Sequence, residues 1–589
     1  MGRTKKVSNA CHFAEIKRTY NGTTYTTSLL RQTYREDGKV KHKTLSNLTH
    51  LPPEALALVK RSLAGEQFIS ASEGLCIERS LPHGHVAAVL GTLRKIGMHE
   101  LLDRKPSRER DLVCGMLVAR VIDARSKLAT SRMLDEQTRS SSLGETLGLE
   151  RIDEDDLYAA MDWLRERQHD VEKALSERHL RGAMLTLYDV SSTYFEGRCC
   201  SLAKHGHSRD GRRDRPQIVF GLITDERGCP VAVEVFEGNT GDPKTVSAQV
   251  KKLRDRFGLE RVVMVGDRGM LTNARIDKDL GPDGIDWISA LRGPQIRKLV
   301  ETGALQLSLF DQRDLAEIKS DDFPDERLVA CRNPLLLEER RRKRNELLAA
   351  TEKKLELIRS SVHRAKRPLR GKEKIGLRVG LALARSKMGK HFRLQIADDS
   401  FRYERRNDNI EQEAALDGIY VIRTSLPKRE LPSAAVVYSY KQLANVERAF
   451  RSIKTIDLKI RPIFHYTPNR VRAHVFLCML AYYIEWHMRA SLAPILFDDH
   501  DRDAAESARK SIVSPAKSSP AATQKAATKR TADGAPVHSF RTLLADLATI
   551  AKNRVRTTLP SGSNTFTTIT APTPLQARAF SLLKIEPAL

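Results

Sequence analysis

Two aspartates each follow directly on a short apolar run of the sequence. Residues 185–188 lead into Asp189, and residues 262–266 lead into Asp267. Apolar runs of this length are typical of buried strands, so we expect each carboxylate at the end of a strand. A carboxylate in such a place is costly unless its charge is neutralised, and a divalent cation held by several carboxylates is one solution. Each aspartate alone could also be a strand-end cap or a turn former.

A third carboxylate, Glu447, lies in a stretch with helical periodicity, residues 438–456. Apolar residues recur there at the spacing of one buried helix face: Leu443, Val446, Phe450 and Ile453. A neighbouring stripe combines an aromatic residue, an acid and two cations: Tyr440, Glu447, Arg451 and Lys454. Glu447 could instead form only a surface pair with Arg451, but such a pair would not need the aromatic neighbour.

A basic loop, residues 198–215, leaves the strand that carries Asp189. It has six Lys and Arg, among them Arg212 and Arg213, against two Asp. We expect its positive charge to face a polyanion near the carboxylates. Its Cys199-Cys200-x4-His205-x-His207 sequence has neither the spacing nor the second ligand pair of a structural zinc site, so we interpret it as a basic loop.

The elements around these residues predict a mixed α/β sheet. Short apolar strands are expected at 185–190, 218–223, 231–236, 262–265 and 287–291, with a helix at 244–257. The second and third strands form an antiparallel hairpin across residues 225–228. This order differs from the regular strand-helix alternation of a parallel sheet.

Taken together, these segments resemble the DDE transposases of bacterial insertion sequences, and most closely the insertion-sequence-four superfamily. The resemblance covers roughly residues 183–490. It is carried by the following motifs: Tyr188-Asp189-Val190-Ser191-Ser192-Thr193-Tyr194-Phe195, Asp210-Gly211-Arg212, Gly238-Asn239-Thr240-Gly241-Asp242, Gly266-Asp267-Arg268-Gly269-Met270, Tyr440-x2-Leu443-x3-Glu447-x6-Lys454 and Arg461-Pro462-Ile463-Phe464-His465. The superfamily signature is Y-x2-R-x3-E-x6-K, so Leu443 stands where the signature has Arg. If that Arg contacts the DNA backbone in the superfamily, Arg448 or Arg451 would make the contact in this chain.

The resemblance implies a ribonuclease H-like fold with Asp189, Asp267 and Glu447 as catalytic metal ligands. Three carboxylates can hold two divalent ions about 4 Å apart, one activating a water or a 3′-hydroxyl and one stabilising the leaving oxygen. Mg²⁺ suits hard oxygen ligands, and Mn²⁺ should substitute for it. We expect DNA contacts from side chains around this centre: Tyr440, Arg448, Arg451, Lys454, Arg212, Arg213 and Arg268.

The interval from Asp267 to Glu447 is far longer than a connection between two elements requires, so it must hold an inserted domain. We place this domain at residues 293–416, before a strand at 419–425; similar transposases carry a strand-rich insertion here. Residues 338–378 contain fifteen Lys and Arg against six Glu, and 338–362 predict a long charged helix. This helix would follow DNA phosphates or form a solvated arm.

We therefore expect seven segments along the chain. They are a basic DNA-binding module at 1–84, a helical domain at 85–180, the first part of the catalytic core at 181–292, the insertion at 293–416, the second part of the core at 417–490, a disordered linker at 491–539 and a C-terminal helical segment at 540–589. The helical domain could contact DNA or a second subunit, or could serve only in packing. The linker prediction rests on residues 501–536, which are rich in Ala, Ser and Lys and lack aromatics.

The composition agrees with a nucleic-acid partner. The chain has 589 residues with 100 Lys and Arg against 74 Asp and Glu, a formal charge of +26. Such an excess favours a polyanion, with an anionic membrane surface as the weaker alternative. Eight irregularly spaced cysteines indicate a reducing compartment, and the longest apolar run, residues 475–484, is too short to span a bilayer. We expect no secretory signal and a cytoplasmic, nucleoid-associated bacterial protein.

The sequence thus predicts a transposase that binds the terminal inverted repeats of an insertion sequence. It would pair them as a homodimer and cut and join double-stranded DNA at element ends and target. Two alternatives stay open: a catalytically silent, sequence-specific DNA-binding protein, and a stand-alone ribonuclease H-like nuclease.

Overall fold

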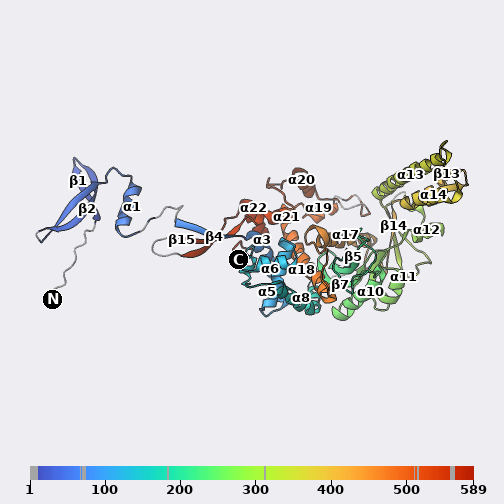
Figure 1. Ribbon diagram of the computed structural model, residues 1–589. Coiled ribbons are helices and arrows are strands. Elements are labelled where there is room, and N and C mark those ends of the chain that lie inside the picture. The colour runs from blue at the N-terminus through green and yellow to red at the C-terminus, as the bar shows by residue number, and fades with distance from the viewer. Residues whose placement is uncertain are drawn as a thin grey trace. The chain divides into compact units, whose positions relative to one another are not determined.

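The computed structural model describes residues 11–36, 38–66, 68, 74–181, 185–310, 313–507, 509, 511–513, 517–557 and 564–588 (Figure 1). The chain forms two compact units. The first combines Met1–Leu81 with Ala551–Ala571, and the second combines Pro82–Ile550 with Pro572–Leu589.

The first unit contains two small antiparallel sheets. One has the order β1-β2-β3, with β1 at Cys11–Tyr20, β2 at Thr23–Glu36 and β3 at Lys39–Asn47. Asn21 and Gly22, both with positive φ, form the two-residue turn between β1 and β2, the geometry that a tight hairpin requires. Helix α1 (Pro53–Leu63) begins with a proline in its first turn and contacts β1, where Lys60 pairs with Glu15 at 2.5 Å.

The second sheet joins segments from the two ends of the chain. Its order is β16-β15-β4, with β4 at Leu75–Pro82, β15 at Ala551–Thr557 and β16 at Thr565–Ile569. The prediction of an all-helical segment at 540–589 therefore differs from the structure. The Thr-rich sequence of β16 suits a strand, and β16 pairs with β15, the strand that precedes it along the chain.

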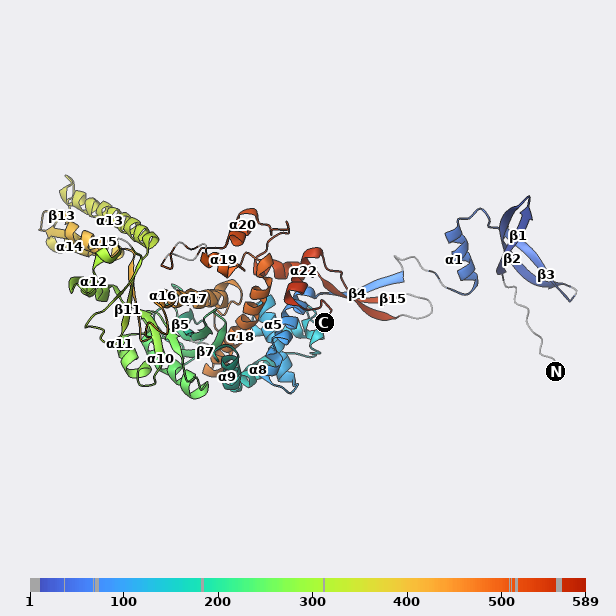
Figure 2. The ribbon, with the colours of Figure 1, turned by 180° about the vertical axis from the view of Figure 1, so that it is seen from behind.

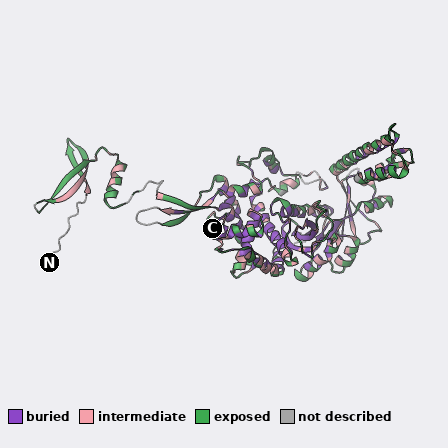
Figure 3. Cartoon of the chain, in the orientation of Figure 1, coloured by how far each residue is buried: buried purple, intermediate pink, exposed green. Residues whose placement is uncertain are grey.

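Helices make up one side of the second unit. They are α3 (Gly84–Lys95), α4 (Met98–Leu102), α5 (Arg108–Ile122), α6 (Lys127–Leu134), α7 (Leu143–Thr146), α8 (Glu154–Glu166), α9 (Gln168–His179), α21 (Phe540–Leu547) and α22 (Pro574–Leu583). The long helix α18 (Pro468–Leu492) contacts α3, α5 and α8 as well as strand β7 of the sheet described next. Its side chains are buried nearly all around between Ala473 and Glu485, as expected for a helix enclosed by a core (Figure 3).

The other side of this unit is one mixed sheet of the order β10-β11-β14-β9-β8-β5-β6-β7. Its central strands are β5 (Leu185–Tyr194), β6 (Gln217–Asp225), β7 (Pro230–Glu237), β8 (Val263–Val265) and β9 (Asp286–Ala290). β5, β6 and β7 pair antiparallel, whereas β8 runs parallel to both β5 and β9. Helix α10 (Asp242–Lys251), continued by the π-helical turn η1 (Lys252–Arg256), precedes β8. The mixed α/β sheet is confirmed, and it is consistent with a ribonuclease H-like DDE core.

Three strands of the interval between Asp267 and Glu447 extend this sheet instead of forming a separate one. β10 (Leu315–Ile318), β11 (Arg327–Arg332) and β14 (Ile419–Thr424) continue it antiparallel beyond β9. α12 (Gly293–Glu301) covers this part with its own apolar cluster, which includes Leu299 and Leu328.

Between β11 and β14 the chain forms a lobe with a second apolar cluster (Figure 2). The lobe consists of α13 (Pro334–His363), α14 (Lys372–Ser386), β12 (Phe392–Ile396), β13 (Phe401–Arg405) and α15 (Asn407–Ala415). Helix α13 contains the predicted charged helix and is capped by Asn333, whose side chain accepts from Leu335 N and Leu336 N. Leu348, Leu355 and Val362 give α13 its buried side.

Residues 491–539, predicted to be disordered, contain ordered elements in the described part of the chain. These are η6 (Ala493–Ile495), α19 (Arg502–Ser507) and α20 (Pro520–Thr528). The buried Lys525 donates from Nζ to the carbonyls of Ala493, Leu496 and Asp498 at 2.8–2.9 Å. Composition does not predict this order, because the segment has few apolar residues. Hydrogen bonds from the buried lysine to backbone carbonyls hold it in place of apolar contacts. Within the described residues no helix is long and apolar enough to cross a membrane.

Candidate active site

Asp189 lies within β5, where the register with β8 places it near Asp267. Leu185 pairs with Val263 and Leu187 with Val265, so each aspartate stands two residues beyond the last parallel pair. β5 does not end at Asp189 as predicted, because the β-forming residues Ser191–Tyr194 continue the pairing with β6; the pair Asp189↔Leu222 lies inside the ladder.

Asp267 is fixed by the turn that follows β8. Its Oδ1 accepts hydrogen bonds from Gly269 N at 2.9 Å and Met270 N at 2.8 Å, while Ser289 Oγ donates to its backbone carbonyl at 3.2 Å. Two backbone donors on one carboxylate oxygen fix the orientation of the side chain.

Glu447 comes from α17 (Leu443–Arg451), a helix that packs on β5. Val446 and Phe450 form its buried side, and Phe450 makes an edge-to-face contact with Phe220 of β6, with ring centroids 5.5 Å apart. Glu447, which lies one turn before Phe450, is exposed at the edge of this buried side.

A break precedes α17, so the predicted continuous helix at 438–456 is two helices and a π-helical turn. α16 (Ser433–Lys441) ends at Gln442, and the amide of Asn445 bonds to Gln442 Oε1 at 2.7 Å and to the carbonyl of Glu226 at 3.2 Å. Leu443, where the superfamily signature has Arg, begins α17 and is half-buried.

The three carboxylates act on one another electrostatically. The pKa of Asp189 is raised to about 7, mainly by burial; the negative charges of Asp267 and Glu447 contribute to the rise, and the Val190 N–H and Arg209 oppose it. Tyr440 of α16 faces the same group: burial raises its pKa to about 12, and Asp267, Glu447 and Asp189 add to the effect. The structure thus brings together the three predicted acids and Tyr440.

This group suits a divalent cation. It offers only carboxylate oxygens, the ligands of Mg²⁺ and Mn²⁺, and a bound cation would offset the burial that raises the pKa of Asp189. In the described chain, the ligand atoms of the three carboxylates do not all lie within 4.8 Å of one another. A site of this kind completes its coordination with water and substrate phosphate.

Two further charged residues at the site were not predicted. The guanidinium of Arg209 lies near Asp189 and pairs with Asp242, the first residue of α10. Both line a cavity of about 250 Å³ that reaches Gly269 beside Asp267. The motif ending in Asp242 was visible in the sequence, but its pairing with Arg209 depends on how the basic loop folds back.

Lys454 lies inside the protein and does not face the solvent with Arg451. The π-helical turn η5 (Ser452–Ile456) changes the side-chain register after α17. Lys454 Nζ lies 2.5 Å from Asp210 Oδ1 and 3.1 Å from Ser191 Oγ, and Arg461 also pairs with Asp210 at 2.5 Å. The structure thus gives Lys454 an internal ion pair in place of the expected DNA contact.

The other predicted DNA contacts are exposed: Arg212, Arg213, Arg268, Arg448 and Arg451. Within the basic loop, Gln217 Nε2 donates to the carbonyls of Arg212 and Arg215 at 3.0 and 2.8 Å. Arg212 pairs with Asp214 and lies over the ring of Tyr194 at 5.3 Å. The loop is therefore tied to the end of β5 and β6.

A mixed sheet with two aspartates on adjacent parallel strands and a glutamate on the helix that packs against them defines the DDE class of phosphoryl-transfer enzymes. Comparison with protein families supports this class. The model described as "Transposase DDE domain" matches residues 197–484, and "IS1634 family transposase, N-terminal domain" matches residues 13–73.

The chain therefore contains a transposase DDE domain, which implies a phosphoryl-transfer enzyme, and its N-terminal part is similar to the N-terminal domain of IS1634 family transposases. Asp267 and Glu447 lie inside the matched DDE range, and Asp189 lies just before it. A search of curated proteins finds no match.

Proposed function

We propose that this transposase binds the terminal inverted repeats of its insertion sequence and moves the element by a cut-and-paste reaction. The observation that carries the proposal is the convergence of Asp189, Asp267 and Glu447 from β5, β8 and α17. The spacing of Tyr440, Glu447 and Lys454 supports a place in the insertion-sequence-four superfamily.

The three carboxylates are the proposed metal ligands. Bound Mg²⁺, or Mn²⁺ in its place, would lower the pKa of an attacking hydroxyl and stabilise the charge on the leaving oxygen. Asp189 would release its proton when the cation is bound, because the ion stabilises the carboxylate whose charged form burial disfavours. Asp267 is oriented by its two backbone donors, and Tyr440 lies near all three carboxylates.

The exposed arginines around the carboxylates are the proposed phosphate contacts. Arg212 and Arg213 would come from the basic loop, Arg268 from the turn after β8, and Arg448 and Arg451 from α17. Phosphate contacts of this kind position DNA without reading its sequence. Sequence recognition we assign to the N-terminal module, where residues 1–61 hold twelve Lys and Arg against four Asp and Glu.

The proposed assembly is a homodimer that holds both element ends, as two ends must be joined to one target. In this arrangement the sheet-forming segments around residues 181–292 and 417–490 supply the chemistry, and the lobe within 293–416 supplies a charged face through α13. The helical domain at 85–180 serves in packing against α18.

The test is a reaction of the purified chain with a DNA fragment that carries one element end and a supercoiled target plasmid. With Mg²⁺ we expect cleavage at the end of the repeat and joined end-plasmid products; with EDTA we expect protection of the repeat from a footprinting nuclease and no cleavage. Nicking without joined products would indicate a stand-alone nuclease. Protection without cleavage in Mg²⁺ would indicate a silent DNA-binding protein, and either result would overturn the proposal.

A further inference from the structure

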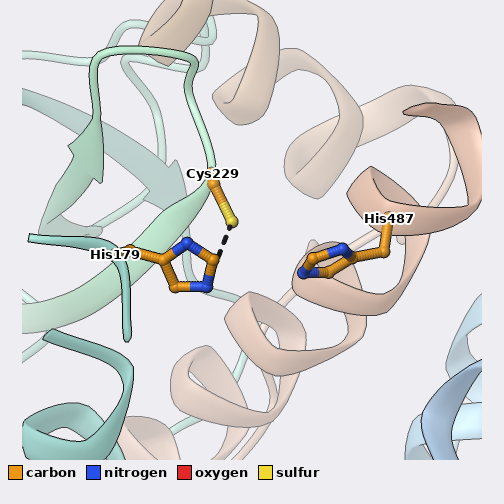
Figure 4. A group of neighbouring side chains, drawn as sticks. All are labelled: His179, Cys229 and His487. Atoms are coloured by element: carbon orange, nitrogen blue, oxygen red, sulfur yellow. Dashed lines mark hydrogen bonds between the residues drawn. The ribbon is translucent and has the colours of Figure 1, made fainter. Parts of the chain in front are cut away.

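A cluster of three potential metal ligands lies apart from the carboxylates: His179, Cys229 and His487 (Figure 4). Their ligand atoms all lie within 4.8 Å of one another, which no other set of three His, Cys, Asp or Glu does in the described part of the chain. They come from the end of α9, the turn between β6 and β7, and α18.

The ligand atoms face a common point in the protein interior. Cys229 Sγ lies 4.0 Å from His179 Nε2, and the hydroxyl of Tyr483 lies 2.9 Å from the same nitrogen. Nε2 of His487 is buried and has no hydrogen-bond partner. An imidazole nitrogen in this state is costly unless something binds it.

The protonation states suit ligation. Burial lowers the pKa of both His179 and His487 to about 4, so each ring is neutral and has a free lone pair at neutral pH. Burial raises the pKa of the Cys229 thiol. Arg178 and Arg227 lie near both rings, and Lys95 lies near His487, while Asp225 faces His179 as the negative group.

Asp225 contacts two of the three ligand residues, Cys229 and His179. Its Oδ1 accepts from Arg227 N and Cys229 N at 2.9 and 2.8 Å, which sets the turn that carries Cys229. Its Oδ2 lies 3.9 Å from His179 Nδ1. A carboxylate behind the non-ligating nitrogen of a histidine is the usual outer partner in zinc sites, since it fixes ring orientation and tautomer.

We propose that His179, Cys229 and His487 bind one Zn²⁺, with water in the fourth position. Nitrogen and sulfur ligands select zinc over Mg²⁺, and tetrahedral bonds of about 2.0–2.3 Å place ligand atoms roughly 3.5 Å apart, a small contraction from the observed spacing. As the S–Zn bond forms, Cys229 loses its thiol proton to solvent. Tyr483 gives up its hydrogen bond to Nε2 and keeps the one from Arg178.

The ion would connect three parts of the second unit that are distant in sequence. His179 is at the end of α9, on the helical side. Cys229 is in the turn between β6 and β7 of the central sheet, and His487 is on α18, which contacts β7. The same turn touches α17, because a Cβ on Gly228 would lie 2.7 Å from Cβ of Asn445. Zinc at this point would therefore fix the turn on which the helix of Glu447 rests.

The experiment is a titration of the full chain, freed of metal by a chelator, with Co²⁺ alone. Cobalt bound to a thiolate gives an intense near-ultraviolet absorption that carboxylate ligands do not produce. We expect this band to saturate at one Co²⁺ per chain and to disappear when Zn²⁺ is added. Its absence at saturating Co²⁺ would overturn the proposal.

Variants separate this site from other cysteines and from the carboxylates. Cys229→Ser should abolish the band, and His487→Gln should weaken Zn²⁺ binding, measured by competition with a chromophoric chelator, at least about tenfold. Cys199→Ser, in the exposed basic loop, and Asp267→Asn should leave the band unchanged. A band that survives in folded Cys229→Ser contradicts the assignment.

A thermal measurement covers the case in which Cys229→Ser does not fold. Zn²⁺ should raise the melting temperature of the metal-free chain, and this rise should be lost in His487→Gln, whose side chain is only partly buried. An equal rise in His487→Gln would contradict the proposal.

Discussion

Lys127 of α6 is a buried cation on the helical side of the second unit. Burial lowers its pKa to about 7, and the neighbouring Arg120 lowers it further. Between pH 7 and 10.5 the unfolded chain therefore binds more protons at this residue than the folded chain. The folded chain therefore loses free energy of unfolding at this residue. The loss is complete below pH 7 and disappears as the pH rises from 7 to 10.5.

Replacing this residue, Lys127→Met, should raise the melting temperature at pH 6. The gain in the free energy of unfolding should reach up to about 5 kcal/mol, since each pKa unit corresponds to about 1.4 kcal/mol. Scanning calorimetry from pH 6 to pH 10 should show the difference from the unsubstituted chain shrinking as the pH rises. The exposed Lys173→Met serves as control, and a difference that is constant with pH would contradict this account.

Lys454 and Arg451 were predicted on one helix stripe but should behave differently. Lys454→Met leaves the buried carboxylate of Asp210 with Arg461 alone, and we expect a loss of stability of about 3 kcal/mol. Arg451→Ala should leave the melting temperature unchanged and weaken DNA binding, with the salt slope reduced by about 1. Denaturant melts and binding isotherms at several salt concentrations measure both. Equal stability losses in the two variants would contradict the placement of Lys454.

At the scale of elements, the lobe is inserted between the two antiparallel strands β11 and β14. Arg332 of β11 pairs directly with Ile419 of β14, and Asn333 N bonds to the carbonyl of Gly418 at 2.8 Å. Gly418 already has φ +75°, and Asn333, at φ −106°, would have to change to positive φ to form with it the Asn-Gly turn that closes two-residue hairpins. The lobe also has its own apolar cluster.

Deletion of residues 334–417 should therefore leave the catalytic sheet folded. We expect a cooperative thermal transition within a few degrees of that of the full chain, because Asn-Gly is a favoured sequence for the two-residue turn that would close the hairpin. Removal of the charged α13 should weaken binding to non-specific DNA. Circular dichroism melts and binding isotherms test this, and aggregation or a non-cooperative melt would show that the lobe is part of the sheet's core.

The elements also show how far the sequence predicts the structure. The apolar runs before Asp189 and Asp267 predict two buried strands, and the periodicity around Val446 and Phe450 predicts the helix of Glu447. The positions of Lys454 and Arg209 could not be predicted, because one depends on a π-helical turn and the other on a loop that folds back on Asp242. His179, Cys229 and His487 are too far apart in sequence to form a motif.

At the scale of the whole molecule, the N-terminal module is a separate body of positive charge. Its sheet β1-β2-β3 and helix α1 lie within the range matched by the IS1634 N-terminal domain. Deletion of residues 1–66 leaves β4 and its partners β15 and β16 in place. The catalytic sheet belongs to the other unit, so its folding should not depend on this module.

We expect this deletion to reduce affinity for element-end DNA at least about tenfold and to spare Mg²⁺-dependent nicking of non-specific DNA. Competition binding between end DNA and random DNA, together with a plasmid nicking assay, measures both. If the shortened chain still distinguishes end DNA from random DNA as well as the full chain does, sequence recognition lies elsewhere.

The central claim is that Asp189, Asp267 and Glu447 act as one metal-binding unit. The most direct measurement is the single-turnover rate of Mg²⁺-dependent cleavage for Asp189→Asn, Asp267→Asn, Glu447→Gln and their pairwise combinations, with the exposed Asp155→Asn and Glu177→Gln as matched controls. Each single variant should lose roughly 1,000-fold or more, equivalent to about 4 kcal/mol of transition-state stabilisation, and the pairs should lose no more than the singles. Full activity in any one of the three folded single variants would contradict the claim.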